Sequence, residues 1–63
     1  MTSARILVID DEPEIRKFLE ISLRSQGYAV PLAPTARAGL AEFSALHPDL
    51  VVLDLGLPDL DGA

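Results

Sequence analysis

The 63-residue chain contains no cysteine, so it can form neither a disulfide nor a thiolate metal site. That composition fits a reducing cytoplasm. A long hydrophobic run is also lacking, because the first strongly apolar stretch covers only residues 6–9. A signal-peptide core needs about 7–15 apolar residues and a membrane span about 20. We therefore expect a cytoplasmic, soluble and unprocessed protein that makes no contact with a membrane.

Basic residues are the second shortage. Five Lys and Arg residues stand against ten Asp and Glu residues, which gives a formal net charge of -5 at pH 7. Binding to nucleic acids is driven by Lys and Arg contacts to phosphates, so this composition argues against direct contact with DNA or RNA. The expected ligand is a cation. The length allows at most one domain, which we assign to residues 1–63.

Strand-like and helix-like patterns alternate along the chain. Continuous apolar runs indicate buried parallel strands, and apolar residues at helical spacing indicate two helices. The segments are a strand, a helix, a strand, a helix, a strand and a loop, predicted at residues 5–10, 13–26, 28–33, 36–46, 50–54 and 55–63. This order predicts an α/β fold with right-handed crossovers and a parallel sheet.

Local signals mark the ends of both helices. Pro13 suits the first helical position, and Gly27 can adopt the left-handed conformation that ends a helix. Thr35 can cap the second helix, and Pro48 forces His47 out of the helical region. We interpret His47 as a solvated turn residue, not as a ligand.

The apolar residues of the two helices are expected to face the sheet. They are Ile15, Phe18, Leu19 and Leu23 in the first helix, and Ala36, Gly39, Leu40, Phe43 and Leu46 in the second. Phe18 and Phe43 are predicted to be core residues, and Gly39 is expected to allow close packing of its helix on the sheet. The charged residues of the first helix, predicted to form a solvated face, are Arg16, Lys17, Glu20 and Arg24.

The weak second strand decides the predicted topology. It contains Pro31, which cannot donate to a strand ladder and is confined to sheet edges or bulges. The predicted strand order is therefore 2-1-3, which makes the first and third strands neighbours. Their carboxyl ends carry Asp10, Asp11 and Asp54, and ligands of open parallel sheets bind outside such ends.

Three carboxylates at one edge of a sheet repel one another. Two unit charges about 4 Å apart cost about 4 kcal/mol at an effective dielectric constant near 20. Protonation of one carboxylate or a bound divalent cation relieves this repulsion, and a few rigid oxygen ligands favour Mg²⁺. A carboxylate beside Mg²⁺ is a competent nucleophile toward phosphorus.

Two motifs carry a resemblance to a known family. They are "VIDDEP" at the end of the first strand and "DLGLPDLDG" after the third, the latter matching D-x-x-x-P-x-x-x-G through Asp54, Pro58 and Gly62. The chain resembles the receiver domain of two-component response regulators over all 63 residues. It is most similar to the OmpR/PhoB class, and within it to the Kdp-type potassium-transport regulators. The resemblance implies the N-terminal half of a flavodoxin-like (CheY-like) doubly wound parallel sheet, truncated after the third strand.

The resemblance implies a role for each motif residue. Asp54 would be the phosphoacceptor, Asp11 would bind Mg²⁺ directly, and Asp10 would hold it largely through water. Asp54 and the backbone carbonyl of Gly56 would complete the metal site. Pro58 and Gly62 would shape the loop.

The resemblance also implies partners. They are a sensor histidine kinase and, through an output domain beyond this chain, DNA. The module would not be an enzyme, apart from its own phosphotransfer and dephosphorylation. The Ser or Thr and the Lys that the family places after its fourth and fifth strands lie beyond this chain, which puts phosphorylation of the 63 residues alone in question.

The same residues admit other interpretations. A phosphohydrolase-like enzyme could use Asp54 as its nucleophile, although the position two residues later, where such enzymes usually carry a second acid, is Gly56. An inactive structural fragment is a further alternative. Residues 10–12 could serve only the helix dipole. The segment 59–62 resembles a calcium loop but lacks its ligand pattern.

The third strand is expected to be a point of weakness. In the family its free edge pairs with a fourth strand, so here it would present unpaired backbone groups on an uncharged apolar run. We expect the chain to associate with itself through this edge. Either residues 6 and 8 or residues 51 and 53 would be partly bare, depending on which face of the sheet is uncovered.

Overall fold

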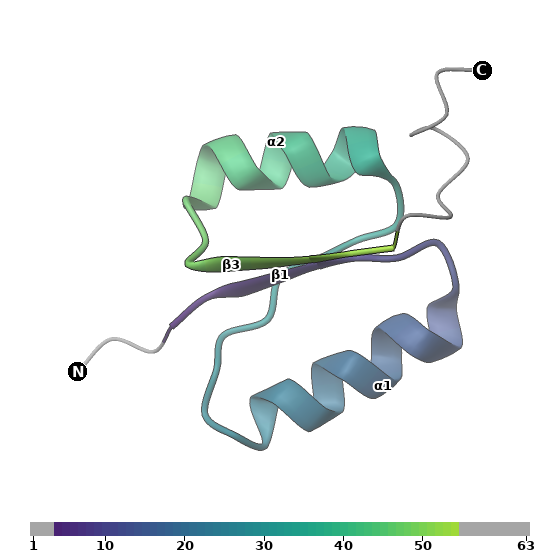
Figure 1. The fold of residues 1–63 in the computed structure, drawn as a ribbon, viewed down its shortest axis with the longest axis vertical. Helices are drawn as coiled ribbons and strands as arrows, with labels where there is room; N and C mark the ends of the chain where they lie inside the picture. Colours follow the sequence, from purple (N-terminus) through teal and green to yellow (C-terminus); the bar gives the residue numbers. More distant parts are fainter. Residues whose placement is uncertain (1–3, 55–63) are drawn as a thin grey trace.

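The central element of the computed structural model, which describes residues 4–54, is the strand β1 (Ile6–Ile9). It is followed by α1 (Pro13–Arg24), β2 (Leu32–Ala33), α2 (Ala36–Leu46) and β3 (Leu50–Leu53), as Figure 1 shows. All strands are parallel and lie in the order β2-β1-β3, which confirms the predicted topology. None of the helices in residues 4–54 is long and apolar enough to cross a membrane.

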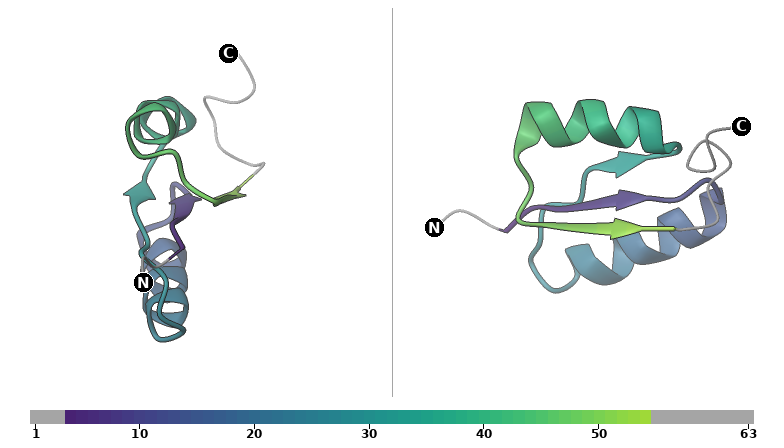
Figure 2. Two further views of the ribbon diagram at one scale, coloured as in Figure 1. Left: turned by 90° about the vertical axis from the view of Figure 1, so that its left-hand side faces the viewer. Right: turned by 45° about the horizontal axis from the view of Figure 1, so that its top comes forward.

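The sheet separates the two helices (Figure 2). Each face of β1 has its own apolar cluster. Leu7 and Ile9 lie on the α2 face, where Ala36 and Ala38 pack against them. On the opposite face, Leu19 and Leu23 of α1 pack against a cluster formed by Ile6, Val8 and Val30. A helix on each face is the doubly wound arrangement that the sequence predicted.

The helix ends follow the local signals. The Thr35 hydroxyl accepts a hydrogen bond from the Ala38 amide at 3.0 Å and so caps α2. Gly27 has a φ of 93° in the turn after α1, and His47 ends α2 in the left-handed conformation. The helix α1 ends at Arg24, two residues earlier than predicted, because residues 25–27 form the turn that reaches Gly27.

The predicted core was too large. Phe18 is 66% exposed, Phe43 is 48% exposed and Leu40 is 70% exposed, so these side chains are not core residues. A three-stranded sheet is narrower than the apolar stripes of its two helices, and side chains at the margins of each stripe have nothing to cover them. Gly39 does lie against the sheet, as predicted, since a Cβ there would meet the side chain of Ile9.

The bare part of the sheet is β3. Ile6 and Val8 are buried, whereas Leu53 is 40% exposed and Val51 is partly exposed. Leu50, which pairs with Ile6 and lies on the α1 side, is 57% exposed, so both faces of the third strand are partly uncovered. The second strand is also shorter than residues 28–33, because only Leu32 and Ala33 complete the ladder beyond an isolated bridge between Arg5 and Ala29.

Candidate metal centre

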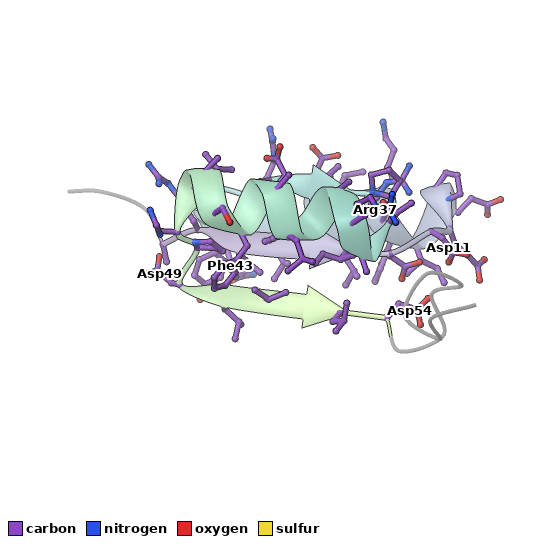
Figure 3. The ribbon with its side chains drawn as sticks, turned by 90° about the horizontal axis from the view of Figure 1, so that it is seen from above. Asp11, Arg37, Phe43, Asp49 and Asp54 are labelled. Atoms are coloured by element: carbon purple, nitrogen blue, oxygen red, sulfur yellow. The ribbon has the colours of Figure 1, made fainter. Side chains whose placement is uncertain are left out.

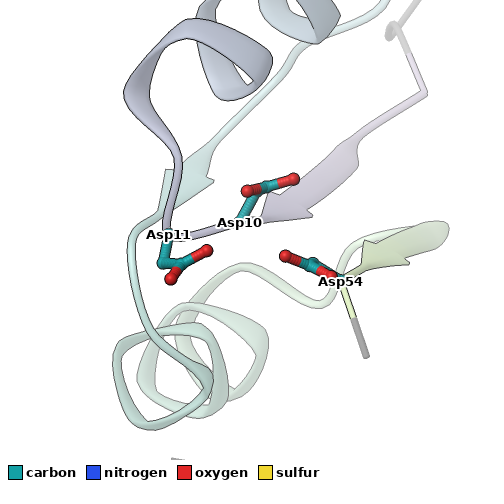
Figure 4. Close-up of side chains that lie close together, drawn as sticks. All are labelled: Asp10, Asp11 and Asp54. Carbon is teal, nitrogen blue, oxygen red and sulfur yellow. The ribbon is translucent and has the colours of Figure 1, made fainter. Parts of the chain in front are cut away.

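Three aspartates meet at the carboxyl edge of the sheet (Figure 4). Asp10 follows β1, Asp11 begins the turn into α1, and Asp54 follows β3. Each offers one carboxylate oxygen, and these three oxygens all lie within 4.8 Å of one another. The prediction that the topology brings these three residues together is confirmed, while their roles remain a prediction.

Asp10 is the most firmly held of the three. It is only 7% exposed, and its Oδ1 accepts a hydrogen bond from the Glu12 amide at 2.9 Å. Its backbone amide donates to the Ala33 carbonyl at 3.1 Å, which ties it to β2. The bond from Glu12 restricts the rotamer of a carboxylate that would otherwise be costly to bury, and the bond to Ala33 fixes its backbone.

Arg16 holds the backbone of Asp10 in place, a contact that was not predicted from the sequence. Its Nη1 donates to the backbone carbonyl of Asp10 at 2.8 Å, and the residue is half-buried. Arg16 was assigned to a solvated helix face, and that assignment was wrong for this residue. The sequence did contain a signal for this contact, because Arg16 lies in the first turn of a helix that begins directly after the acidic residues. A cation there offsets part of the repulsion among the carboxylates.

Asp54 and Asp11 complete the cluster from two different elements. The Asp54 amide donates to the Ile9 carbonyl at 3.0 Å, so the ladder between β3 and β1 continues up to this residue. This bond fixes the position of Asp54 along the strand, beside Asp10. Asp54 is half-buried and Asp11 is exposed, and their carboxylates point toward each other beside Asp10 (Figure 4). The cluster is thus open to solvent on the Asp11 side.

The donor set fits a hard divalent cation. All three groups supply oxygen, which is the ligand type of Mg²⁺ and Ca²⁺. Mg²⁺ binds oxygen at about 2.0–2.1 Å, so two of its ligands stand about 3–4 Å apart. A spacing within 4.8 Å reaches this range with a small rotamer adjustment or one intervening water. Gly56, Pro58 and Gly62 lie outside the described residues.

Comparison with known proteins agrees with the fold. Residues 6–63 match the family model of the response regulator receiver domain. The structure is similar to that of the chemotaxis response regulator CheY4 of Vibrio cholerae, with a TM-score of 0.87 and 32% identity over 90% of this chain and 48% of that chain. The flavodoxin-like fold predicted from the sequence is therefore confirmed.

Curated relatives agree as well. The chain is 47% identical over 57 residues to the KDP operon transcriptional regulatory protein KdpE of Escherichia coli (strain K12), covering 90% of this chain and 25% of that protein. It is 49% identical over 57 residues to the transcriptional regulatory protein KdpE of Mycobacterium tuberculosis (strain ATCC 25618 / H37Rv), with the same two shares. The predicted similarity to Kdp-type regulators of the OmpR/PhoB class is confirmed. The chain spans about a quarter of the length of these relatives. It belongs to the response regulator receiver family.

Proposed function

We propose that this chain is the phosphoacceptor part of a cytoplasmic two-component response regulator and that Asp54 receives the phosphoryl group. The observation that carries the proposal is the position of Asp54, at the end of β3 and within 4.8 Å, oxygen to oxygen, of Asp10 and Asp11. A nucleophile needs a fixed position and neutralisation of the charge that develops on the phosphoryl group. A strand end beside a cation site meets both needs.

In the proposed reaction a carboxylate oxygen of Asp54 attacks the phosphorus of a phosphohistidine. The new O–P bond forms while the P–N bond breaks, and the electron pair of that bond leaves with the imidazole nitrogen. Asp11 would ligate Mg²⁺ directly, Asp10 would hold it largely through water, and Asp54 and the Gly56 carbonyl would complete the set. When bound, Mg²⁺ would neutralise negative charge on the carboxylates and on the phosphoryl oxygens.

The proposed partners follow from this chemistry. A sensor histidine kinase would supply the phosphoryl group. DNA would be reached only through an output domain outside this chain, since the chain itself carries a net charge of -5. A second copy of the chain is a further partner, through the edge of β3. The module would catalyse at most its own phosphotransfer and dephosphorylation, because Gly56 stands where phosphohydrolases carry a second acid.

Binding of Mg²⁺ tests the site in the chain itself. We expect Mg²⁺ to shift the amide resonances of Asp10, Asp11 and Asp54, and Asp11→Asn to weaken binding by about tenfold or more because one charge of the ligand set is lost. Asp49→Asn is the matched control, since Asp49 lies at the opposite end of β3 (Figure 3) and accepts a hydrogen bond from the Arg5 amide. Equal effects of both substitutions would contradict the assignment.

Phosphorylation tests the nucleophile. A small phosphodonor with Mg²⁺ should give acid-labile phosphate that is absent from Asp54→Asn and retained in Asp49→Asn. We expect labelling of the 63-residue chain to be slow beside that of a longer chain that includes the family's Ser or Thr and its Lys. Labelling that survives Asp54→Asn would refute the proposal. Steady release of phosphate from a phosphomonoester would favour the phosphohydrolase. The absence of both labelling and phosphate release would favour an inactive fragment.

A further inference from the structure

Arg16 ties the start of α1 to the end of β1 through one hydrogen bond. Its Nη1 donates to the backbone carbonyl of Asp10 at 2.8 Å, and the residue is half-buried. β1 ends at Ile9, so this carbonyl lies beyond the strand ladder, and within residues 4–54 the guanidinium of Arg16 is its donor. The acceptor is the backbone oxygen, so this bond does not occupy the Asp10 carboxylate.

The bond bears most directly on the next residue, Asp11. The Asp10 carbonyl belongs to the planar peptide unit that also contains the nitrogen and the Cα of Asp11. The amide of Asp10 donates to the Ala33 carbonyl at 3.1 Å, so both backbone polar groups of Asp10 are held. The peptide plane from which the exposed Asp11 continues is therefore fixed. A fixed plane lowers the entropy that Asp11 would lose on becoming a metal ligand.

The place of Arg16 is an unusual one for a cation. The N-terminal turn of a helix favours negative charge, and Glu14 in the same turn follows that preference. A long side chain that is half-buried also loses conformational freedom. The charge-assisted hydrogen bond to the Asp10 carbonyl offsets these costs. The position of Arg16 thus has a reason in the turn that carries the aspartates.

We propose that Arg16 is a positioning residue of the cation site, which raises the affinity for Mg²⁺ by holding the peptide unit between Asp10 and Asp11. This role rests on the cation site of the proposed function. The charge of Arg16 acts in the opposite direction, because a guanidinium near the carboxylates repels an incoming cation. Positioning and charge can therefore be separated by the sign of their effects on the affinity.

Two substitutions that each remove one positive charge provide the first test. Arg16→Gln removes the charge and the bond to Asp10, whereas Lys17→Gln removes an equal charge from the next residue of α1, which is exposed. Loss of a group that orients metal ligands typically costs about 10–100-fold in affinity. Since the lost charge offsets part of this effect, we expect Arg16→Gln to weaken Mg²⁺ binding by about threefold to tenfold. Lys17→Gln should leave binding unchanged or slightly stronger.

The affinity is measured from Mg²⁺ titrations of the amide resonances of the folded chain, which report native molecules alone. A loss of stability in a variant therefore does not enter the measured affinity. Arg16→Gln that binds Mg²⁺ as tightly as Lys17→Gln overturns the proposal.

Arg16→Lys distinguishes the bond from the charge in a second way. It keeps the positive charge and one donor on a long side chain, so it should bind Mg²⁺ more tightly than Arg16→Gln if the bond to Asp10 matters. Repulsion alone predicts the reverse, because lysine carries the charge that glutamine lacks. Equal or weaker binding by Arg16→Lys overturns the proposal.

Hydrogen exchange without Mg²⁺ gives a readout that needs no cation. The Glu12 amide donates to Asp10 Oδ1 at 2.9 Å, and it should exchange faster in Arg16→Gln than in Lys17→Gln because the turn is loosened. Equal exchange overturns the proposal. Asp11→Asn separates the two levels of the assignment. Weaker Mg²⁺ binding in Asp11→Asn with unchanged binding in Arg16→Gln refutes the role of Arg16 alone, and unchanged binding in both refutes the cation site itself.

Discussion

Two strands of almost the same composition occupy different environments in this molecule. β1 reads Ile-Leu-Val-Ile and is buried along its whole length, with exposed fractions between 0% and 6%. β3 reads Leu-Val-Val-Leu, yet Leu50 is 57% exposed and Leu53 is 40% exposed. β1 lies between two strands and two helices, whereas β3 has only β1 beside it among the described residues. An apolar run thus predicts a strand, and the position of that strand in the sheet decides how deeply it is buried.

The largest expected effect separates the two strands directly. Leu7→Ala in β1 should lower the free energy of unfolding by about 3 kcal/mol, because the side chain is 0% exposed and its removal leaves a cavity. Leu50→Ala in β3 should lower it by less than about 1 kcal/mol. A chain of this size has a total stability of about 3–9 kcal/mol, so Leu7→Ala should remove between a third and all of it. Urea unfolding followed by circular dichroism measures both, and equal losses would mean that β3 is covered in solution.

A second substitution examines how closely α2 covers β1. Gly39→Ala should lower the free energy of unfolding by about 1–2 kcal/mol, because the new Cβ would lie 2.8 Å from Ile9 Cγ1 and meet Cδ1 as well. The better helix propensity of alanine, about 1 kcal/mol, offsets only part of this overpacking. Ser44→Ala, at an exposed site of the same helix, should leave stability unchanged or slightly raised. Adding Ile9→Val to Gly39→Ala should recover part of the loss, and a stabilising Gly39→Ala would show that the contact is loose.

The smallest expected effect is local and concerns hydrogen exchange. The Val8 amide, which donates to the Pro31 carbonyl at 3.0 Å, should exchange slowly. The Val51 and Leu53 amides should exchange fast in dilute solution, because a parallel ladder alternates and, within residues 4–54, no strand lies on the side of β3 that these amides face. The Val52 amide, which faces β1, serves as the control. Protection of Val51 and Leu53 that grows with protein concentration would sharpen the contrast between the strands. Slow exchange of both at high dilution would show that another group covers the edge.

Features that depend on neighbours in sequence were predictable. Thr35 caps α2 and Gly27 takes a positive φ after α1 because capping needs a short polar side chain or a missing Cβ at one position. The parallel order with β2 at the edge followed from the strand–helix alternation and from Pro31. The meeting of Asp10 and Asp54 needed only that order, since the carboxyl ends of adjacent parallel strands lie together.

Features that depend on coverage were decided by the tertiary structure. Phe18 and Phe43 sit on the apolar stripes of their helices, but three strands do not reach far enough to bury them. Arg16 donates a hydrogen bond to the Asp10 carbonyl across the turn that joins β1 to α1, a contact that no periodicity encodes. Helical and strand periods report which side of an element is apolar, and hydrogen-bonding patterns report its ends. Whether an apolar side is buried depends on the width of the sheet, and that width is a property of the assembled strands.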